Sequence, residues 1–156
     1  MDLERQLLAA QGYSELGMPA EALEELDALG PEFAEHPEVL NARLYVLLKA
    51  RRWEDGLAAA LRLCRAEPKR TSGFIHAAFC LHELGRTPEA KQILLSGPPD
   101  LDREATYHYN LGCYDAVLGN PDEARRHLLR SFQIDRKFRA IAKLDPDLES
   151  LRDWLA

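Results

Sequence analysis

The sequence lacks the features that direct a protein into a membrane or an oxidising compartment. No apolar run approaches the roughly 18 residues that a membrane-spanning helix needs. Residues 1–5 are largely charged, whereas a signal peptide requires an apolar stretch. Cys64, Cys80 and Cys113 cannot all pair with one another, and no Cys-x-x-Cys motif is present. We therefore expect a cytoplasmic protein whose reduced cysteines are buried as small hydrophobic residues.

Motifs for catalysis are also missing. The sequence has no Gly-rich phosphate loop, no nucleophile elbow and no His-Glu-x-x-His helix. Asp100, Asp102 and Glu104 form an acidic loop, but an acid–base pair needs a pocket that separates the two pKa values. We interpret these carboxylates as solvated caps of the following helix. We therefore expect neither enzyme activity nor a bound cofactor.

The charge balance disfavours polyanionic partners. Twenty Lys and Arg residues stand against 26 Asp and Glu residues, and the net charge of −6 repels nucleic acid and anionic membrane. Hydrophobic residues make up 46% of the chain, too many for a disordered protein. We expect a single folded domain, residues 1–156, that binds neither nucleic acid nor membrane.

An internal repeat of 34 residues organises the chain. Leu16-Gly17, Leu84-Gly85 and Leu118-Gly119 are separated by 68 and then 34 residues, and Arg51 occupies the skipped position. A small residue follows five positions after each of these four points: Ala22, Gly56, Ala90 and Ala124. The period divides the chain into four units, residues 3–36, 37–70, 71–104 and 105–136.

Each unit has the signals of two antiparallel helices. The glycine lies where a first helix ends in a left-handed residue. Pro19 and Pro121 open a second helix, and Pro88 lies one residue later in its unit. The small residue of the second helix lets the paired helices approach closely. Ala10, Ala78 and Gly112 supply the matching small residue on the first helices, although Leu44 breaks this pattern in the second unit. The predicted helices are residues 3–16, 19–29, 37–50, 53–66, 71–84, 87–96, 104–118 and 121–134.

These units resemble the tetratricopeptide repeat family. The clearest stretch runs from His108-Tyr109-Asn110-Leu111-Gly112 to Leu118-Gly119-Asn120-Pro121-Asp122-Glu123-Ala124. Trp53 and Pro68 take the usual aromatic and proline positions of the second unit, and the resemblance covers about residues 3–136. It implies an all-α, right-handed solenoid of four helix hairpins. In such solenoids the first helix of each unit lines a concave groove.

The repeat pattern stops after Arg136, because Pro146 stands where a fifth unit needs a small contact residue. We predict that residues 137–156 form a cap of two short helices, residues 137–144 and 148–155. Asp145-Pro146-Asp147 between them supplies a helix cap and a helix start. The residues expected to cover the last repeat are Leu148, Leu151, Trp154 and Leu155. Such a cap keeps the end of a solenoid soluble.

The resemblance also implies which residues form the groove wall. They are Leu7, Gln11, Asn41, Tyr45, Leu48, Ile75, Phe79, His82, Tyr109 and Cys113. Much of this wall is apolar or aromatic, as in surfaces that bind a helix or an extended peptide. Alternatively, these side chains pack between adjacent units or lie under the C-terminal helices. The lysine-rich clamp by which some family members grip a terminal carboxylate is missing, because Leu7, Ile75 and His76 occupy clamp positions.

Two further groups have alternative readings. His76 and Cys80 share a helical face near His82, but His82 is predicted to point to the groove while Cys80 turns away, so we expect no metal site. A basic group fits an acidic patch on a partner or, as the balance of charges favours, a solvated convex face balanced by nearby carboxylates. Its members are Arg125, Arg126, Arg130, Arg136, Lys137 and Arg139.

We predict from these patterns a non-catalytic adaptor that docks a segment of a partner protein in its groove, as a monomer or weak homo-oligomer. A structural assembly factor is the main alternative. It would bridge or stabilise an oligomer or a cytoskeletal filament, and would recognise its partner in folded, assembled form. A secretion-type chaperone is a looser match, because such chaperones carry about three repeats and a distinct N-terminal helix.

Overall fold

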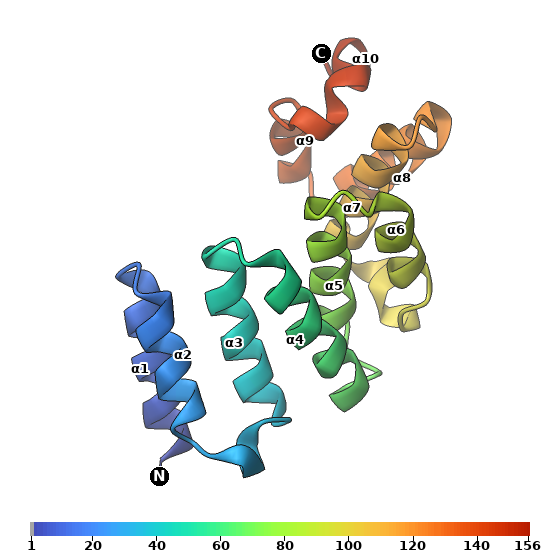
Figure 1. Cartoon of the computed structure of the whole chain (residues 1–156). Coiled ribbons are helices and arrows are strands. Elements are labelled where there is room, and N and C mark those ends of the chain that lie inside the picture. The colour runs from blue at the N-terminus through green and yellow to red at the C-terminus, as the bar shows by residue number, and fades with distance from the viewer. Residues whose placement is uncertain (1) are drawn as a thin grey trace.

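The computed structural model describes residues 2–156, which fold into helices and connecting turns. Eight helices pair as four hairpins: α1 (Leu3–Glu15) with α2 (Pro19–Asp27), α3 (Pro37–Lys49) with α4 (Trp53–Ala66), α5 (Ser72–Glu83) with α6 (Thr87–Leu95), and α7 (Ala105–Val117) with α8 (Pro121–Ile134). The hairpins stack in chain order, and the two termini lie at opposite ends of the array (Figure 1). The predicted α-solenoid is confirmed, and each of its eight helices has both ends within two residues of the predicted positions.

The same turn closes all four hairpins. Gly17, Gly85 and Gly119 have φ angles of 75°, 78° and 81°, a left-handed conformation that glycine adopts without strain. In each turn, the next amide donates to a carbonyl five residues back at 2.8–2.9 Å, which is the Schellman arrangement. Arg51, at the position without glycine, closes the same turn with a φ of 59°. The repeat geometry therefore holds a non-glycine residue in an unfavourable conformation.

Leu44, which breaks the small-residue pattern of the first helices, lies opposite a glycine. Leu44 is buried in α3, and the second helix of that hairpin carries Gly56. A Cβ on Gly56 would be in ordinary van der Waals contact with Leu44 Cδ1, at 4.0 Å, but would lie only 3.1 Å from Cys80 Sγ, so its absence leaves room for Cys80 of the next hairpin. The other second helices carry fully buried alanines at this position, Ala22, Ala90 and Ala124.

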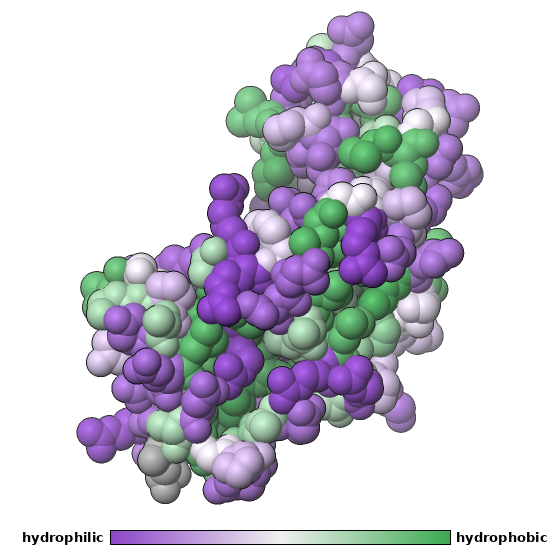
Figure 2. Space-filling view, viewed as in Figure 1, coloured by the Kyte–Doolittle hydropathy of each residue, from purple (hydrophilic) through white to green (hydrophobic). Residues whose placement is uncertain are grey.

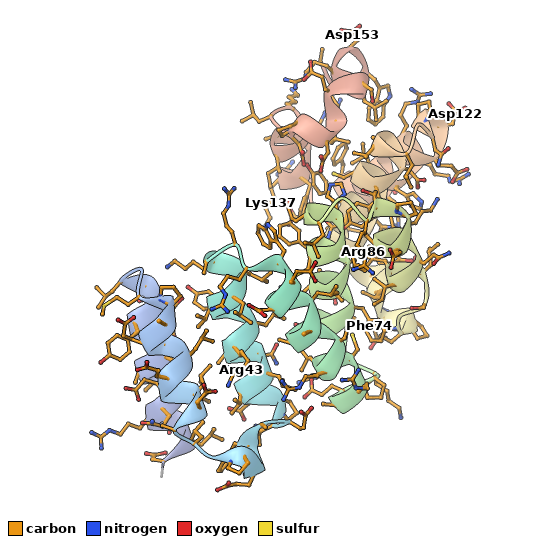
Figure 3. The ribbon with its side chains drawn as sticks, in the orientation of Figure 1. Arg43, Phe74, Arg86, Asp122, Lys137 and Asp153 are labelled. Carbon is orange, nitrogen blue, oxygen red and sulfur yellow. The ribbon has the colours of Figure 1, made fainter. Side chains whose placement is uncertain are left out.

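The first hairpin joins the array through a hydrophobic cluster of its own. Leu26 and Leu29, from α2 and the turn after it, pack with Val39 and Val46 of α3. Arg43 of α3 (Figure 3) adds an ion pair, with its Nη2 2.6 Å from Oδ1 of Asp27. On the face shown in Figure 2, hydrophilic residues cover much of this hairpin and hydrophobic residues gather in the gap beside it.

The C-terminal segment packs on the fourth hairpin as α9 (Lys137–Ala142), the 3₁₀ helix η3 (Pro146–Leu151) and α10 (Arg152–Leu155). Leu148, Leu151 and Leu155 are buried in the main core and Trp154 is half-buried, as predicted. The predicted helix over residues 148–155 is wrong in detail. Leu148 has φ −102° and ψ 16°, which interrupts the helix before α10 begins.

Two further 3₁₀ helices, η1 (Pro31–Phe33) and η2 (Pro99–Arg103), connect hairpins. The acidic loop does not cap α7 as predicted, because the Glu104 side chain accepts a hydrogen bond from the Thr71 hydroxyl and not from the first turn of α7. Within residues 2–156, no helix combines the length and the apolarity that a membrane crossing requires.

The close contact between α7 and α8 generates a stability prediction. A Cβ on Gly112 would lie 2.7 Å from Leu128 Cγ and 3.3 Å from the Ala124 carbonyl oxygen. Gly112→Ala should therefore lower the free energy of unfolding by about 1–3 kcal/mol, measured by urea denaturation. Gly12→Ala is the matched control, since no atom lies within 4 Å of its Cβ position. It should raise stability by about 0.5–1 kcal/mol. Equal effects of the two changes would contradict this close contact.

The left-handed turn at Arg51 generates a second prediction. Arg51→Gly removes the steric cost of φ 59° and should raise the free energy of unfolding by roughly 0.5–1 kcal/mol, after the greater entropy of the unfolded glycine is subtracted. Gly85→Ala introduces that cost at an equivalent turn and should lower stability by about 1 kcal/mol. Thermal and urea denaturation measure both changes. A destabilised Arg51→Gly variant would show that contacts of the arginine side chain stabilise the fold by more than the left-handed backbone conformation costs.

Candidate functional site

The predicted groove residues lie on α1, α3, α5 and α7, the first helices of the four hairpins, whose surface we call the inner face. Eight of them, His82 included, are exposed or half-buried. The seven other than His82 form what we call its open half: Leu7, Gln11, Asn41, Tyr45, Leu48, Ile75 and Phe79. His82, Tyr109 and Cys113 form what we call its covered half, because the C-terminal segment contacts them. The structure thus divides the predicted wall into two parts.

Two adjacent hollows shape the open half. The first, of about 520 Å³, lies between α1 and α3. It is lined by Glu4, Leu7, Leu8, Gln11, Glu38, Asn41, Ala42 and Tyr45. The second, of about 420 Å³, extends toward α5 and includes Leu48, Lys49 and His76. Tyr45 contributes to both hollows and remains 46% exposed. A half-exposed tyrosine offers a partner both a ring face and a hydroxyl group.

Phe79 extends the apolar surface beyond the hollows. Its ring is 37% exposed and packs edge-on against Trp53, with the ring centroids 5.7 Å apart at 76°. Trp53, the aromatic residue of the second unit, therefore supports Phe79, a predicted groove residue of the third unit. A side chain held in this way loses little conformational entropy when a partner binds.

Polar residues that line the second hollow are engaged within the chain. Asn41 Nδ2 donates to the Pro37 carbonyl at 3.1 Å, and Asn41 Oδ1 accepts from Ser72 Oγ at 3.4 Å. His76 Nδ1 lies 2.8 Å from the Ser72 carbonyl oxygen. Lys49 Nζ lies 6.0 Å from the Tyr45 ring centroid. Because these polar groups already have partners within the chain, the second hollow offers a partner mainly its apolar and aromatic surface.

The C-terminal segment occupies the other half of the inner face. The Tyr109 hydroxyl donates to Asp145 Oδ2 at 2.7 Å, and Cys113 Sγ lies 3.6 Å from the same oxygen. The Phe138 ring packs on Tyr109 with the ring centroids 5.1 Å apart. Tyr109 and Cys113 are consequently 6% and 4% exposed. The prediction that both line an accessible groove is corrected here, because residues of the same chain cover them.

An ion pair joins the segment to the third hairpin. His82 Nε2 lies 2.7 Å from Asp147 Oδ2, and His82 Nδ1 lies 2.9 Å from Thr87 Oγ1. The hydrogen bond to Asp147 raises the pKa of His82, and burial opposes this shift. Tyr114 supports the imidazole, with the ring centroids 4.8 Å apart. His82 is therefore a residue that anchors the cap and not one that is free for a partner.

Cys113, Asp145 and Asp147 come close enough to be considered as metal ligands, since their ligand atoms lie within 4.8 Å of one another. Each already has a protein partner, because Asp145 binds Tyr109 and Asp147 binds His82. A hydrogen-bonded network explains this geometry without an ion. Among the described residues, the His76, Cys80 and His82 group does not converge as metal ligands would.

The cysteines lie in environments that suppress thiolate formation. Cys80 and Cys113 are buried, as predicted, and Cys64 is half-buried. Burial raises the pKa of Cys64 and Cys80 to about 11 and raises that of Cys113 further. Because the thiolate is the nucleophile and the metal ligand, these thiols have the character of packing residues.

The predicted basic group lies on α8 and α9 at the C-terminal end of the array, where Figure 3 labels Lys137 and Asp122. Arg125 pairs with Asp122 and Arg126 with Glu123. Lys137 Nζ lies 3.3 Å from Asp135 Oδ2, and the Arg139 guanidinium lies 5.9 Å from the Phe132 ring centroid. In the part of the chain that the structure describes, Arg130 and Arg136 are exposed and have no ion-pair partner. Neighbouring carboxylates therefore balance half of the group.

Sequence reasoning missed a buried carboxylate between the third and fourth hairpins. Asp115 is fully buried, and its Oδ1 accepts from Lys91 Nζ at 2.7 Å and from Asn120 Nδ2 at 3.1 Å. His127 Nε2 lies 3.5 Å from the other oxygen, and burial lowers the pKa of His127 against the attraction of Asp115. Its partners lie on three elements, so no local pattern signals the cluster. It joins hairpins and is remote from the open half.

Comparison with known proteins identifies the fold alone. The structure is similar to a solved structure of MamA RS-1 (ArsTM double mutant), with a TM-score of 0.74, 16% identity, and coverage of 88% of this chain and 77% of that one. It is also similar to MamA MSR-1 C2, with a TM-score of 0.70, 18% identity, and coverage of 88% and 79%. No protein-family model and no curated protein matches the sequence.

The His82–Asp147 pair makes the attachment of the cap pH-dependent. The pair raises the folded pKa of His82 above its ordinary value of 6.5, so its contribution is complete below that value. The contribution is lost as the pH rises through the folded pKa. His82→Gln should therefore cost stability at about pH 5.5, on the order of 1 kcal/mol, and much less at about pH 8.5.

Urea denaturation at both pH values measures this difference. His36→Gln is the control, because His36 caps α3 far from Asp147 and should leave the pH dependence of the wild type in place. A cost of His82→Gln that is the same at both pH values would show that the imidazole stabilises the cap by packing and not by its charge.

Proposed function

We propose that this chain is a non-catalytic protein-binding module of tetratricopeptide type, and that a segment of a partner protein docks on the open half of its inner face. The observation that carries this proposal is the uncovered row of apolar and aromatic side chains on three successive hairpins. Leu7, Tyr45 and Phe79 belong to this row, and the 520 Å³ and 420 Å³ hollows lie along it. Exposed apolar surface of this kind typically marks an interaction site.

The covered half supports the proposal because its residues already hold a polypeptide segment of the same chain. Tyr109 occupies the same repeat position as Leu7 and Asn41, and Cys113 the same position as Tyr45. In the fourth hairpin these positions contact a short segment, Asp145–Leu148, that is not part of a repeat. The inner face is thus suited to hold a polypeptide segment across its first helices. On the first three hairpins, the equivalent positions are left for a segment of another protein.

An assembly factor is the second candidate function, and a specific observation favours it. At the C-terminal end, Ile141 and Leu144 are 47% and 82% exposed beside the basic residues Arg139 and Lys143. Isolated exposed leucines are common, but an apolar pair next to basic residues suits contact with a folded, acidic surface. In this case the cap would be the binding surface and the open half would be dispensable.

Site-specific photo-crosslinking in native lysate distinguishes the two candidates. A photoreactive residue in place of Leu8, which is 63% exposed and lines the first hollow, should form a crosslink to one segment of the partner. The matched control places it at Leu95, which is 56% exposed on α6. Tyr45→Ala should weaken binding of the identified segment by roughly 2 kcal/mol, the cost typical of a central tyrosine, as measured by fluorescence anisotropy.

Circular dichroism must show that each variant remains folded. Binding that survives Tyr45→Ala but is lost in an Ile141→Ser, Leu144→Ser variant would reject docking on the open half and favour the assembly factor. Equal crosslinking from the Leu8 and Leu95 positions would also count against a single docking face.

A further inference from the structure

The charge around the first hollow points to the chemistry of its ligand. Resting on the proposed function, we infer that the partner segment is basic as well as apolar, with lysine or arginine side chains placed over α1 and α3 next to leucine-like residues. Two observations carry this inference: the position of two unpaired carboxylates at the hollow itself, and the distribution of charge along the whole chain.

Glu4 and Glu38 both line the first hollow. They occupy the same position of the 34-residue repeat, in the first turns of α1 and α3, and both are exposed. Within residues 2–156, neither carboxylate has a hydrogen-bond or ion-pair partner, and the hydrogen bonds of both residues are made by their backbone amides. The pair thus borders an apolar surface with negative charge that no group of this chain neutralises.

Helix stability explains only part of this arrangement. A carboxylate in the first turn is favoured by the helix dipole, which accounts for glutamate at either position. The equivalent positions of the third and fourth hairpins, however, carry Ser72 and Thr106. The acidic rim is therefore confined to the two hairpins that form the first hollow, next to Leu7, Leu8 and Tyr45.

The excess of negative charge in the chain lies in the same region as the two glutamates. Residues 1–50 contain ten acidic and three basic residues, while residues 51–156 contain 16 acidic and 17 basic residues. The negative charge of the protein therefore lies in the part that forms the first hollow. Arg43, one of the three basic residues, is neutralised by Asp27. A field of this kind attracts and orients a cationic segment before contact.

The second hollow limits how such a segment can lie. Lys49 and His76 line it, so a cationic group placed there would be repelled by the Lys49 ammonium group. The favoured orientation puts the basic end of the segment at Glu4 and Glu38. Its apolar residues then lie over Tyr45 and toward Phe79, where the surface is aromatic.

Three fluorescein-labelled peptides test the inference. They share a core of leucine and alanine and differ only in flanking residues, which are lysine, glutamine or glutamate. Fluorescence anisotropy should show the lysine peptide binding on the order of tenfold more tightly than the glutamine peptide, and the glutamate peptide binding most weakly. The preference should shrink as salt is added, because the carboxylates are exposed to solvent.

Two double variants, each of which removes two negative charges, test whether the preference for lysine depends on Glu4 and Glu38. Glu4→Gln with Glu38→Gln should reduce the affinity of the lysine peptide to that of the glutamine peptide. Glu24→Gln with Glu54→Gln is the matched control, since both residues are exposed on α2 and α4 away from the hollows, and it should keep the preference. A preference that survives the first pair of changes or disappears with the second would overturn the inference.

The two proposals fail in different ways. If Tyr45→Ala weakens all three peptides equally and they bind with equal affinity, docking on the open half stands and the basic class of ligand is rejected. If no peptide binds, or if Tyr45→Ala leaves every affinity unchanged, both the docking face and its ligand chemistry are rejected.

Discussion

The close approach of two helices within each hairpin is the constraint on which the rest of the structure depends. It requires a small residue where the helices meet, and the buried alanines, Gly56 and Gly112 meet this requirement with different partners. Because one contact geometry recurs four times, residues that are 34 positions apart point in the same direction. The inner face, its hollows and its repeated glutamates all follow from that equivalence.

The inner face serves two purposes at its two ends. In the covered half, Asp145 caps η3 by accepting a hydrogen bond from the Asp147 amide, and it accepts another from the Tyr109 hydroxyl. Asp147 in turn pairs with His82. These contacts close the array with residues that end the repeat pattern. The cap therefore has two effects, since it stabilises the fourth hairpin and restricts the accessible surface to the first three.

Electrostatic asymmetry reinforces this division. Residues 1–50, which have an excess of acidic residues, include the helices that form the first hollow, and Glu4 and Glu38 line it. The basic residues of α8 and α9 lie at the other end and are partly neutralised by Asp122, Glu123 and Asp135. A segment docked as we propose would meet a surface with a defined polarity along the array. Shape alone leaves both directions of such docking open, and the charges favour one of them.

The 34-residue period was sufficient to predict the helices and their turns, because glycine, proline and small residues act on neighbours within a few positions. The stacking of the hairpins was implied by the resemblance to tetratricopeptide repeats. Even Arg51 adopts the turn geometry that its place in the repeat requires. The accessible part of the groove could not be predicted in this way. It depends on contacts between distant residues, Tyr109 with Asp145 across 36 positions and His82 with Asp147 across 65. Only the folded chain brings these side chains together, and sequence patterns that extend over a few residues do not identify contacts between such distant positions.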